Sequence, residues 1–119
     1  MKILVVDDDY LMRHMLELLL CGNGYEVVTA ADGARGMTIF RSFAPDLVIT
    51  DILMPEQEGI ETIRLMRHER PDAKIMAISG GAQLRNFDVL PMAAKLGADE
   101  VMHKPIDPAE LLSRVRSLA

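Results

Sequence analysis

The sequence predicts an α/β protein built on a doubly wound parallel sheet with helices on both faces. Two observations lead to this class. Short apolar runs typical of buried strands alternate along the 119-residue chain with segments whose apolar residues recur at helical spacing. Such an alternation indicates βα units, in which each helix carries the chain back across a face of the sheet to start the next parallel strand.

Five strands are expected, three of them in the middle of the sheet. The continuous apolar runs at 3–6, 47–49 and 75–78 fit strands that are buried on both faces. The runs at 26–29 and 100–103 are interrupted by polar residues, which suits edge strands. With three central and two edge strands, a flavodoxin-like (βα)5 fold with strand order 2-1-3-4-5 is the economical topology.

Apolar stripes predict a helix after each strand. The stripes are Leu11, Met15, Leu18 and Leu19; Met37, Phe40 and Phe43; Ile60, Ile63 and Met66; Met92, Ala93 and Leu96 in a short fourth helix; and Leu111, Leu112, Val115 and Leu118. We expect each stripe to pack against the sheet. Asp107 and Pro108 precede the last stripe as an N-cap and a proline at the first helical position, a typical helix start.

The composition excludes several classes of protein. Thirteen basic and eighteen acidic residues give a net charge of -5, which disfavours a nucleic-acid or anionic-membrane surface. The single cysteine, Cys21, excludes an intrachain disulfide and is expected to be a small buried apolar residue of its helix. No apolar run reaches membrane-spanning length, and the start of the chain does not read as a signal peptide. We therefore expect one cytoplasmic domain over residues 1–119.

Acidic side chains follow two strands that should be neighbours. Asp7, Asp8 and Asp9 follow the first strand, and Asp51 follows the third. Ligands of open parallel sheets bind beyond the carboxyl ends of the strands, where the strand order reverses. Carboxylates held this closely repel each other, so they need a proton or a cation, and Mg²⁺ suits them because it binds one or two carboxylates together with phosphate oxygens. Asp9 is expected to cap the following helix instead.

A hydroxyl and an ammonium group are expected at the same edge. Ser79 ends the fourth strand and Lys104 follows the fifth. A hydrogen-bond donor and a positive charge suit the oxygens of a phosphoryl group, which a central carboxylate can then attack at phosphorus. Asp51 is the expected nucleophile, because Asp7 and Asp8 form a pair that can hold the metal ion.

Together these residues resemble the receiver domain of two-component response regulators (CheY-like). The matching segments are 3–9, 51–55 with Gly59, 78–79 and 104–105. They occur in the right order, and the resemblance extends over essentially the whole chain. The resemblance implies a role in phosphorelay signalling. The phosphoryl donor would be the phosphohistidine of a histidine kinase or of a phosphotransfer protein.

The resemblance also implies a set of metal and acceptor residues. Asp51 would accept the phosphoryl group, Asp8, Asp51 and the backbone carbonyl of Leu53 would contact Mg²⁺ directly, and Asp7 would contact it through water. Such a domain catalyses its own phosphotransfer and slow autodephosphorylation, so it is a phosphoacceptor and not an enzyme with an external substrate. The positions that help orient the hydrolytic water in this family are Leu53 and Gly81 here, and neither side chain can hydrogen-bond. We therefore expect a comparatively long-lived phosphoryl group.

By the same resemblance, Ser79 would be the switch hydroxyl and Lys104 the phosphate-binding lysine, with a cis bond between Lys104 and Pro105. Phosphorylation would change the surface of the fourth helix, fifth strand and fifth helix, which would control a downstream protein or an output domain and offers a dimer interface. The family usually has an aromatic residue where this chain has Val101. A smaller repacking would have to replace the swing of an aromatic ring.

Two other functions are open at this point. A phosphatase of the haloacid dehalogenase type also places a nucleophilic aspartate after its first strand, in a D-x-D pattern that Asp7 and Asp9 satisfy. That family expects threonine or valine at the position of Leu11, and it would give Asp51 no role. A pseudo-receiver that binds partners without being phosphorylated is the second alternative, and it would not need the complete set of site residues.

Overall fold

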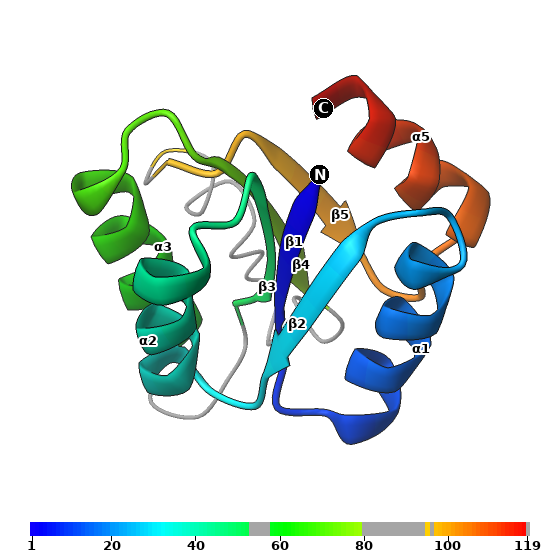
Figure 1. Ribbon diagram of the computed structural model, residues 1–119, viewed down its shortest axis with the longest axis horizontal. Coiled ribbons are helices and arrows are strands. Elements are labelled where there is room, and N and C mark those ends of the chain that lie inside the picture. The colour runs from blue at the N-terminus through cyan, green and yellow to red at the C-terminus, as the bar shows by residue number, and fades with distance from the viewer. Residues whose placement is uncertain (53–57, 80–94, 96, 119) are drawn as a thin grey trace, which may run out of the picture.

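The computed structural model describes residues 1–52, 58–79, 95 and 97–118. Within these residues, five parallel strands form one sheet in the order β2-β1-β3-β4-β5 (Figure 1). The elements are β1 (Lys2–Val6), α1 (Tyr10–Cys21), β2 (Glu26–Ala30), α2 (Gly33–Phe43), β3 (Leu47–Asp51), α3 (Glu58–Glu69), β4 (Lys74–Ser79), β5 (Glu100–His103) and α5 (Pro108–Leu118). The α/β class and the predicted strand order are confirmed.

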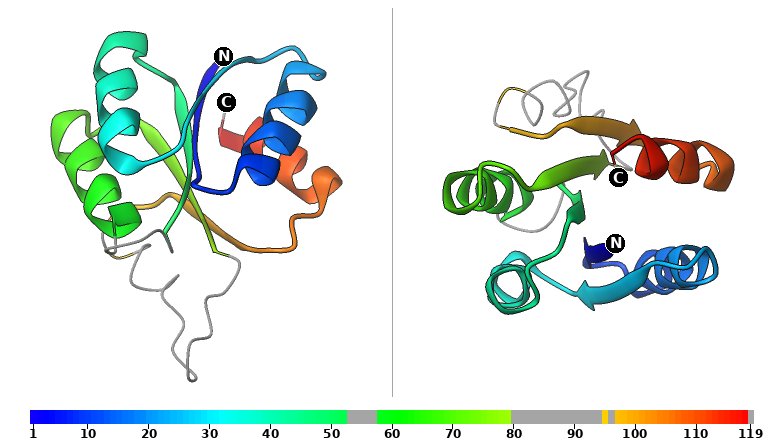
Figure 2. Two further views of the ribbon diagram at one scale, coloured as in Figure 1. Left: turned by 90° about the horizontal axis from the view of Figure 1, so that it is seen from below. Right: turned by 45° about the horizontal axis from the view of Figure 1, so that its top comes forward.

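The helices cover both faces of the sheet. Helices α2 and α3 lie on one face, and α1 and α5 lie on the other (Figure 2). Successive strand residues point to opposite faces, so Leu4 and Val6 of β1 pack toward α2 and α3 while Ile3 and Val5 pack toward α1 and α5. The continuous apolar runs of the sequence therefore supply the apolar cores on both sides.

Helix α1 packs with a different face from the one predicted. Leu16 and Leu20 are the buried residues of this helix. Three residues of the predicted stripe are exposed instead, Leu11 at 75%, Met15 at 38% and Leu18 at 61%. The prediction was wrong because α1 carries apolar residues on two faces, and spacing alone does not show which face meets the sheet. Cys21, expected to be buried, is exposed.

The remaining stripes that fall within the described residues are confirmed. Their buried members are Met37 and Phe40 on α2, Ile63 and Met66 on α3, and Leu111 and Val115 on α5, with Phe43, Ile60, Leu112 and Leu118 partly buried. The expected fourth helix, with Met92, Ala93 and Leu96, lies outside the described residues. None of the described helices has both the length and the apolar character needed to cross a bilayer.

Aspartates begin three of the described helices, with Asp32 as the N-cap of α2. Asp9 is the N-cap of α1, and its side chain accepts hydrogen bonds from the N–H groups of Leu11 and Met12. Asp107 accepts a hydrogen bond from the N–H of Ala109 at the start of α5. Asp9 thus takes the capping role that was expected for it.

Helix α3 begins in close contact with the end of β3. A Cβ atom on Gly59 would lie 2.4 Å from the carbonyl oxygen of Asp51 and 2.4 Å from the Cα of Ile52. Both neighbours are backbone atoms, so they cannot rotate away as a side chain would. Gly59 therefore fixes how closely α3 approaches the backbone that carries Asp51.

Replacing Gly59 with alanine should destabilise the protein. An alanine inside a helix normally gains about 1 kcal/mol over glycine, but the overlap with Asp51 and Ile52 should reverse that sign and cost about 2 kcal/mol. Urea unfolding at equilibrium measures the difference. In the control Gly36→Ala, the new Cβ would meet only the Val6 side chain, at 3.0 Å, and should cost less. Equal losses in both variants would contradict the close-approach explanation.

Candidate functional site

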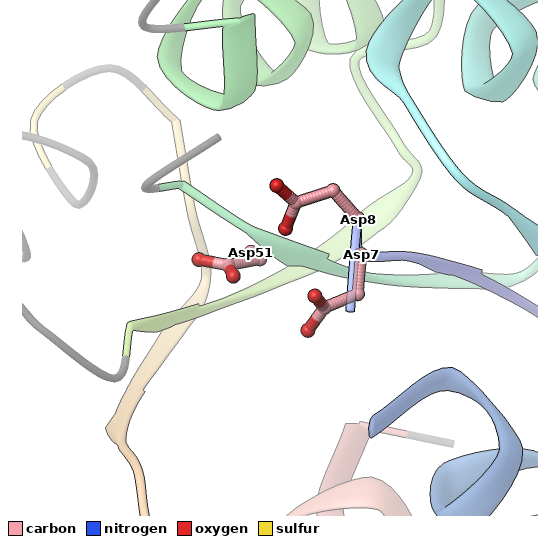
Figure 3. Close-up of side chains that lie close together, drawn as sticks. All are labelled: Asp7, Asp8 and Asp51. Carbon is pink, nitrogen blue, oxygen red and sulfur yellow. The ribbon is translucent and has the colours of Figure 1, made fainter. Parts of the chain in front are cut away.

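Carboxylates from two adjacent strands gather at one edge of the sheet. Val6 pairs with Thr50 across β1 and β3, so the residues that follow Val6 emerge beside Asp51 at the end of β3. Figure 3 shows Asp7, Asp8 and Asp51 together at these strand ends. One oxygen from each of the three lies within 4.8 Å of the others. Asp7 and Asp51 are buried, and Asp8 is exposed.

The ammonium group of Lys104 lies between the two buried carboxylates. Its Nζ is 3.0 Å from Oδ2 of Asp7 and 3.1 Å from Oδ2 of Asp51. The backbone of Lys104 is held as well, because its N–H donates a hydrogen bond of 2.8 Å to the carbonyl of Ser79. The peptide bond between Lys104 and Pro105 is cis. Residues from β1, β3, β4 and the end of β5 are thus joined in one polar cluster.

Burial and charge act against each other in this cluster. The pKa of Asp7 is raised, first by burial and further by the nearby charge of Asp51, despite hydrogen bonds from the Asp9 N–H and from Lys104 that act to lower it. Burial by itself would lower the pKa of Lys104, but the hydrogen bond to Asp7 and the charges of Asp51 and Asp7 together raise it above its ordinary value. The ammonium therefore stays protonated, while the carboxylates still carry more negative charge than it neutralises.

Ser79 adds a hydroxyl group at the end of β4. The side chain is 1% exposed, and its Oγ has no hydrogen-bond partner within the described part of the chain. A buried hydroxyl without a partner is costly, since it has lost water and gained nothing in return. Its neighbours in the sheet place it beside the carboxylates, because Asp51 pairs with Ile78, the residue before Ser79. Within the described residues, the Ser79 hydroxyl is therefore able to donate a hydrogen bond to a further group.

The donor set fits a small, hard divalent cation. The three clustered groups offer only carboxylate oxygens, the ligand type that Mg²⁺ and Ca²⁺ prefer, and the exposure of Asp8 gives access from solvent. The cluster can therefore bind a metal ion. The backbone carbonyl of Leu53, the remaining ligand implied by the resemblance, lies outside the described residues, as does Gly81.

Sequence reasoning missed Arg13, and it named Gly59 without the contact that this glycine makes. Arg13 on α1 donates a hydrogen bond of 2.7 Å from Nη1 to the backbone carbonyl of Asp7. Gly59 allows α3 to approach Asp51, and the sequence motif that contains Gly59 did not show this contact. For Arg13 the only available signal was its position one helical turn after the N-cap Asp9.

Val101 lies away from the carboxylate cluster. Its side chain is partly buried and packs against the core on the α2 and α3 face of the sheet. Its carbonyl accepts a hydrogen bond of 3.2 Å from Arg114 on α5, which also pairs with Glu100 at the start of β5. Val101 therefore links β5 to α5 through its backbone.

Comparison with known sequences identifies relatives of this chain. The family model described as the response regulator receiver domain matches residues 3–116. The probable transcriptional regulator ycf27 of Cyanophora paradoxa is 43% identical over 117 residues, which are 98% of this chain and 47% of that protein. The DNA-binding response regulator MtrA of Mycobacterium leprae is 35% identical over 116 residues, 98% of this chain and 50% of that protein. The chain spans about half the length of the curated relatives it matches.

Solved structures agree with the sequence matches. A response regulator receiver domain protein from Clostridium thermocellum has a TM-score of 0.88 at 30% identity, covering 98% of this chain and 92% of that one. A CheY-like receiver domain protein from Methanospirillum hungatei has a TM-score of 0.88 at 31% identity, covering 98% and 90%. With the family match over nearly its whole length, the chain belongs to the response regulator receiver domains, the phosphoacceptor signalling domains of two-component systems.

Proposed function

We propose that this chain is a Mg²⁺-dependent, cytoplasmic phosphorelay receiver that accepts a phosphoryl group on Asp51 from a phosphohistidine. The donor is a histidine kinase or a phosphotransfer protein, and residues 1–119 act as one receiver domain. The observation that carries this proposal is the Lys104 ammonium, which lies 3.0 and 3.1 Å from carboxylate oxygens of Asp7 and Asp51. Asp8 stands within reach of the same point.

In the transfer step, a carboxylate oxygen of Asp51 forms a bond to phosphorus while the bond from phosphorus to the histidine nitrogen breaks. The electron pair of that bond stays on the imidazole, whose other nitrogen carries a proton, so the ring leaves as neutral imidazole, and the product is an acyl phosphate on Asp51. Lys104 lies 3.1 Å from Oδ2 of Asp51, so its charge can stabilise the oxygens of the incoming phosphoryl group, and the Ser79 hydroxyl is a donor for one of them. Hydrolysis of this acyl phosphate would return the domain to its starting state.

Asp7, Asp8 and Asp51 would hold the Mg²⁺ ion. When bound, the ion supplies positive charge that offsets the repulsion among these carboxylates and the charge of the phosphoryl oxygens. Lys104 alone balances two buried carboxylates incompletely, which explains why the site needs a second cation before a phosphate can approach.

Asp7 is poorly suited to act as the nucleophile. The Asp7 side chain is 0% exposed, and both of its oxygens already accept hydrogen bonds, one from the Asp9 N–H at 2.9 Å and one from Lys104. These bonds hold the Asp7 carboxylate and reduce its nucleophilicity. The phosphatase alternative, which requires an aspartate after β1 as the nucleophile, is therefore less well supported than the receiver.

The switch would act through the ends of β4 and β5. A phosphoryl group on Asp51 offers new hydrogen bonds to Ser79 and Lys104, and phosphorylation favours whichever conformation makes them. Because Lys104 follows β5, the surface of β5 and α5, together with the region of the expected fourth helix, is the proposed output surface. It would control a partner or an output domain, for which the DNA-binding activity in the name of MtrA is one candidate, and it offers a dimer interface.

The phosphoryl donor would dock on the exposed side of α1. Leu11, Met15 and Leu18, which we call the α1 stripe, are exposed apolar residues on the helix that begins directly after the carboxylate cluster. Apolar residues exposed together on one side of a helix are a typical protein-binding surface. A helical donor that packs on the α1 stripe would bring its phosphohistidine toward Asp51.

Removal of the Asp51 carboxylate should abolish phosphorylation. Incubation with Mg²⁺ and acetyl phosphate should add one phosphoryl group to the wild type, measured by intact mass, and none to Asp51→Ala. The control Asp72→Asn changes an exposed acidic residue outside the cluster and should be modified like the wild type. Persistent modification of Asp51→Ala that is lost in Asp7→Asn would instead support the phosphatase reading.

Replacing Asp7 with asparagine should stabilise the metal-free protein at neutral pH. The pKa of Asp7 is raised in the folded state, so folding disfavours its ionised form. Ionised Asp7 therefore lowers the free energy of unfolding, and this loss is complete once the pH exceeds the folded-state pKa. As the pH falls below the unfolded value of about 3.9, both states are protonated and the gain from Asp7→Asn should disappear. Urea unfolding at a series of pH values measures this. A gain that is constant with pH would reject the electrostatic cause.

A charge in the α1 stripe should slow phosphorylation by a histidine kinase and leave phosphorylation by acetyl phosphate unchanged. In a panel of autophosphorylated histidine kinases, the one that phosphorylates the wild type fastest should act on Leu18→Glu at least about tenfold more slowly, because a buried charge opposes docking. Acetyl phosphate, which needs no docking surface, should react at an unchanged rate. The control Leu65→Glu lies on α3, on the other face of the sheet, and should not affect either donor. Equal slowing with both donors would place the effect in the chemical site.

A further inference from the structure

Arg13 connects the exposed side of α1 to the backbone of the carboxylate cluster. Its Nη1 donates a hydrogen bond of 2.7 Å to the carbonyl oxygen of Asp7. The guanidinium also lies over the ring of Tyr10, with 5.7 Å between its carbon and the ring centre. Tyr10 in turn stacks on His14, with ring centres 5.9 Å apart and an angle of 5° between the rings. The Arg13 guanidinium thus contacts both the Asp7 carbonyl and an aromatic ring of the same helix.

The carbonyl that Arg13 binds belongs to Asp7, the first residue beyond the end of β1. The last pairs of β1 are Val6 with Ala30 of β2 and Val6 with Thr50 of β3. Beyond them, the Asp7 N–H still donates to the Ala30 carbonyl at 3.1 Å. The N–H and carbonyl of one strand residue point to the same side, so the Asp7 carbonyl also faces β2, beyond the last paired residue Ala30, and no backbone N–H of the described residues donates to it. Arg13 supplies the donor instead.

With this bond, the peptides on both sides of Asp8 are fixed. The Asp7 carbonyl before Asp8 is held by Arg13, and the Asp9 N–H after it donates to Oδ1 of Asp7 at 2.9 Å. The Asp8 side chain itself is exposed. The direction in which Asp8 leaves the backbone is therefore the main constraint on where its carboxylate lies.

We propose that Arg13 is a positioning residue for Asp8 and thereby sets the affinity of the carboxylate cluster for a divalent cation. The inference rests on the proposed function in one respect, the binding of a cation by Asp7, Asp8 and Asp51. An oxygen ligand that is oriented before the metal arrives loses less conformational entropy on binding. Residues that orient ligands in this way typically contribute 10-fold to 100-fold to metal affinity.

Titration of metal-free protein with Mn²⁺ tests the proposal without any phosphorylation. The electron paramagnetic resonance signal of free Mn²⁺ reports the fraction of the metal that remains unbound. Displacement of bound Mn²⁺ by added Mg²⁺ then gives the affinity of the site for Mg²⁺. Arg13→Met keeps the length of the side chain and removes the donor, and it should bind Mn²⁺ at least about tenfold more weakly. Arg13→Lys supplies one donor, and since a single N–H reaches the Asp7 carbonyl it should restore most of the affinity. The control Arg35→Met removes a largely exposed arginine of α2 and should match the wild type.

A second measurement separates positioning from loss of folding. Hydrogen exchange of the Asp9 amide in the metal-free protein should accelerate in Arg13→Met. The Asp9 N–H bonds to the Asp7 side chain, and Asp7 is the residue whose carbonyl loses its hydrogen bond in this variant. Amides of the central strands β1 and β3 should exchange as in the wild type. Faster exchange throughout the sheet would mean that the variant loses affinity by unfolding, and this would overturn the proposal.

The two proposals fail in different ways. If Arg13→Met binds Mn²⁺ within about twofold of the wild type, Arg13 does not position the ligands, while the receiver function stands. If Arg13→Lys is as weak as Arg13→Met although both are folded, donation to the Asp7 carbonyl is not the cause, and the inference is again rejected. If the wild type itself binds no Mn²⁺ or Mg²⁺, the metal requirement of the proposed function fails and the role of Arg13 fails with it.

Discussion

The site depends on one positive charge shared between two buried carboxylates. Lys104 approaches Asp7 and Asp51 from the end of β5, and its pKa is raised by their charges and hydrogen bonds against the effect of burial. Because Asp8 adds a third carboxylate at the rim, the cluster remains short of positive charge. That shortage of positive charge would favour a bound cation, as the proposed function requires. It also means that folding brings together groups that repel, so the rest of the molecule must hold them in place.

The parallel sheet supplies that restraint. The central strands bury side chains on both faces, and residues such as Leu4, Ile49 and Ile75 are 0% exposed. Full burial of one such side chain contributes about 1.5–3 kcal/mol, so the apolar core can offset repulsion among the carboxylates. The paired registers of β1 with β3 and of β3 with β4 then leave little freedom to the strand ends. Rigidity in the core is what keeps Asp7 and Asp51 at one point.

The sequence was sufficient to predict features that depend on topology alone. The meeting of Asp7, Asp51 and Lys104 followed from the rule that parallel strands place their carboxyl ends at one edge, and the structure brings these residues together. Features that depend on individual packing contacts were not predictable. The inward face of α1 was wrongly assigned because two apolar stripes compete on that helix. The hydrogen bond of Arg13 escaped notice because it joins a side chain to a backbone carbonyl, which no residue pattern encodes.

If Asp51 is phosphorylated as proposed, Val101 would limit the ways in which the phosphoryl group can alter the outer surface. Its β-branched side chain is partly buried against the core, and such side chains have few accessible rotamers, so a swing at this position would move little surface. The backbone of β5 offers a different connection. Lys104 donates its N–H to the carbonyl of Ser79 at one end of the strand, and the Val101 carbonyl accepts from Arg114 of α5 nearer the other. A pull on Ser79 and Lys104 would therefore displace β5 and α5 together. Under the proposed function, a small movement of a packed strand and helix would take the place of a rotating ring as the switch.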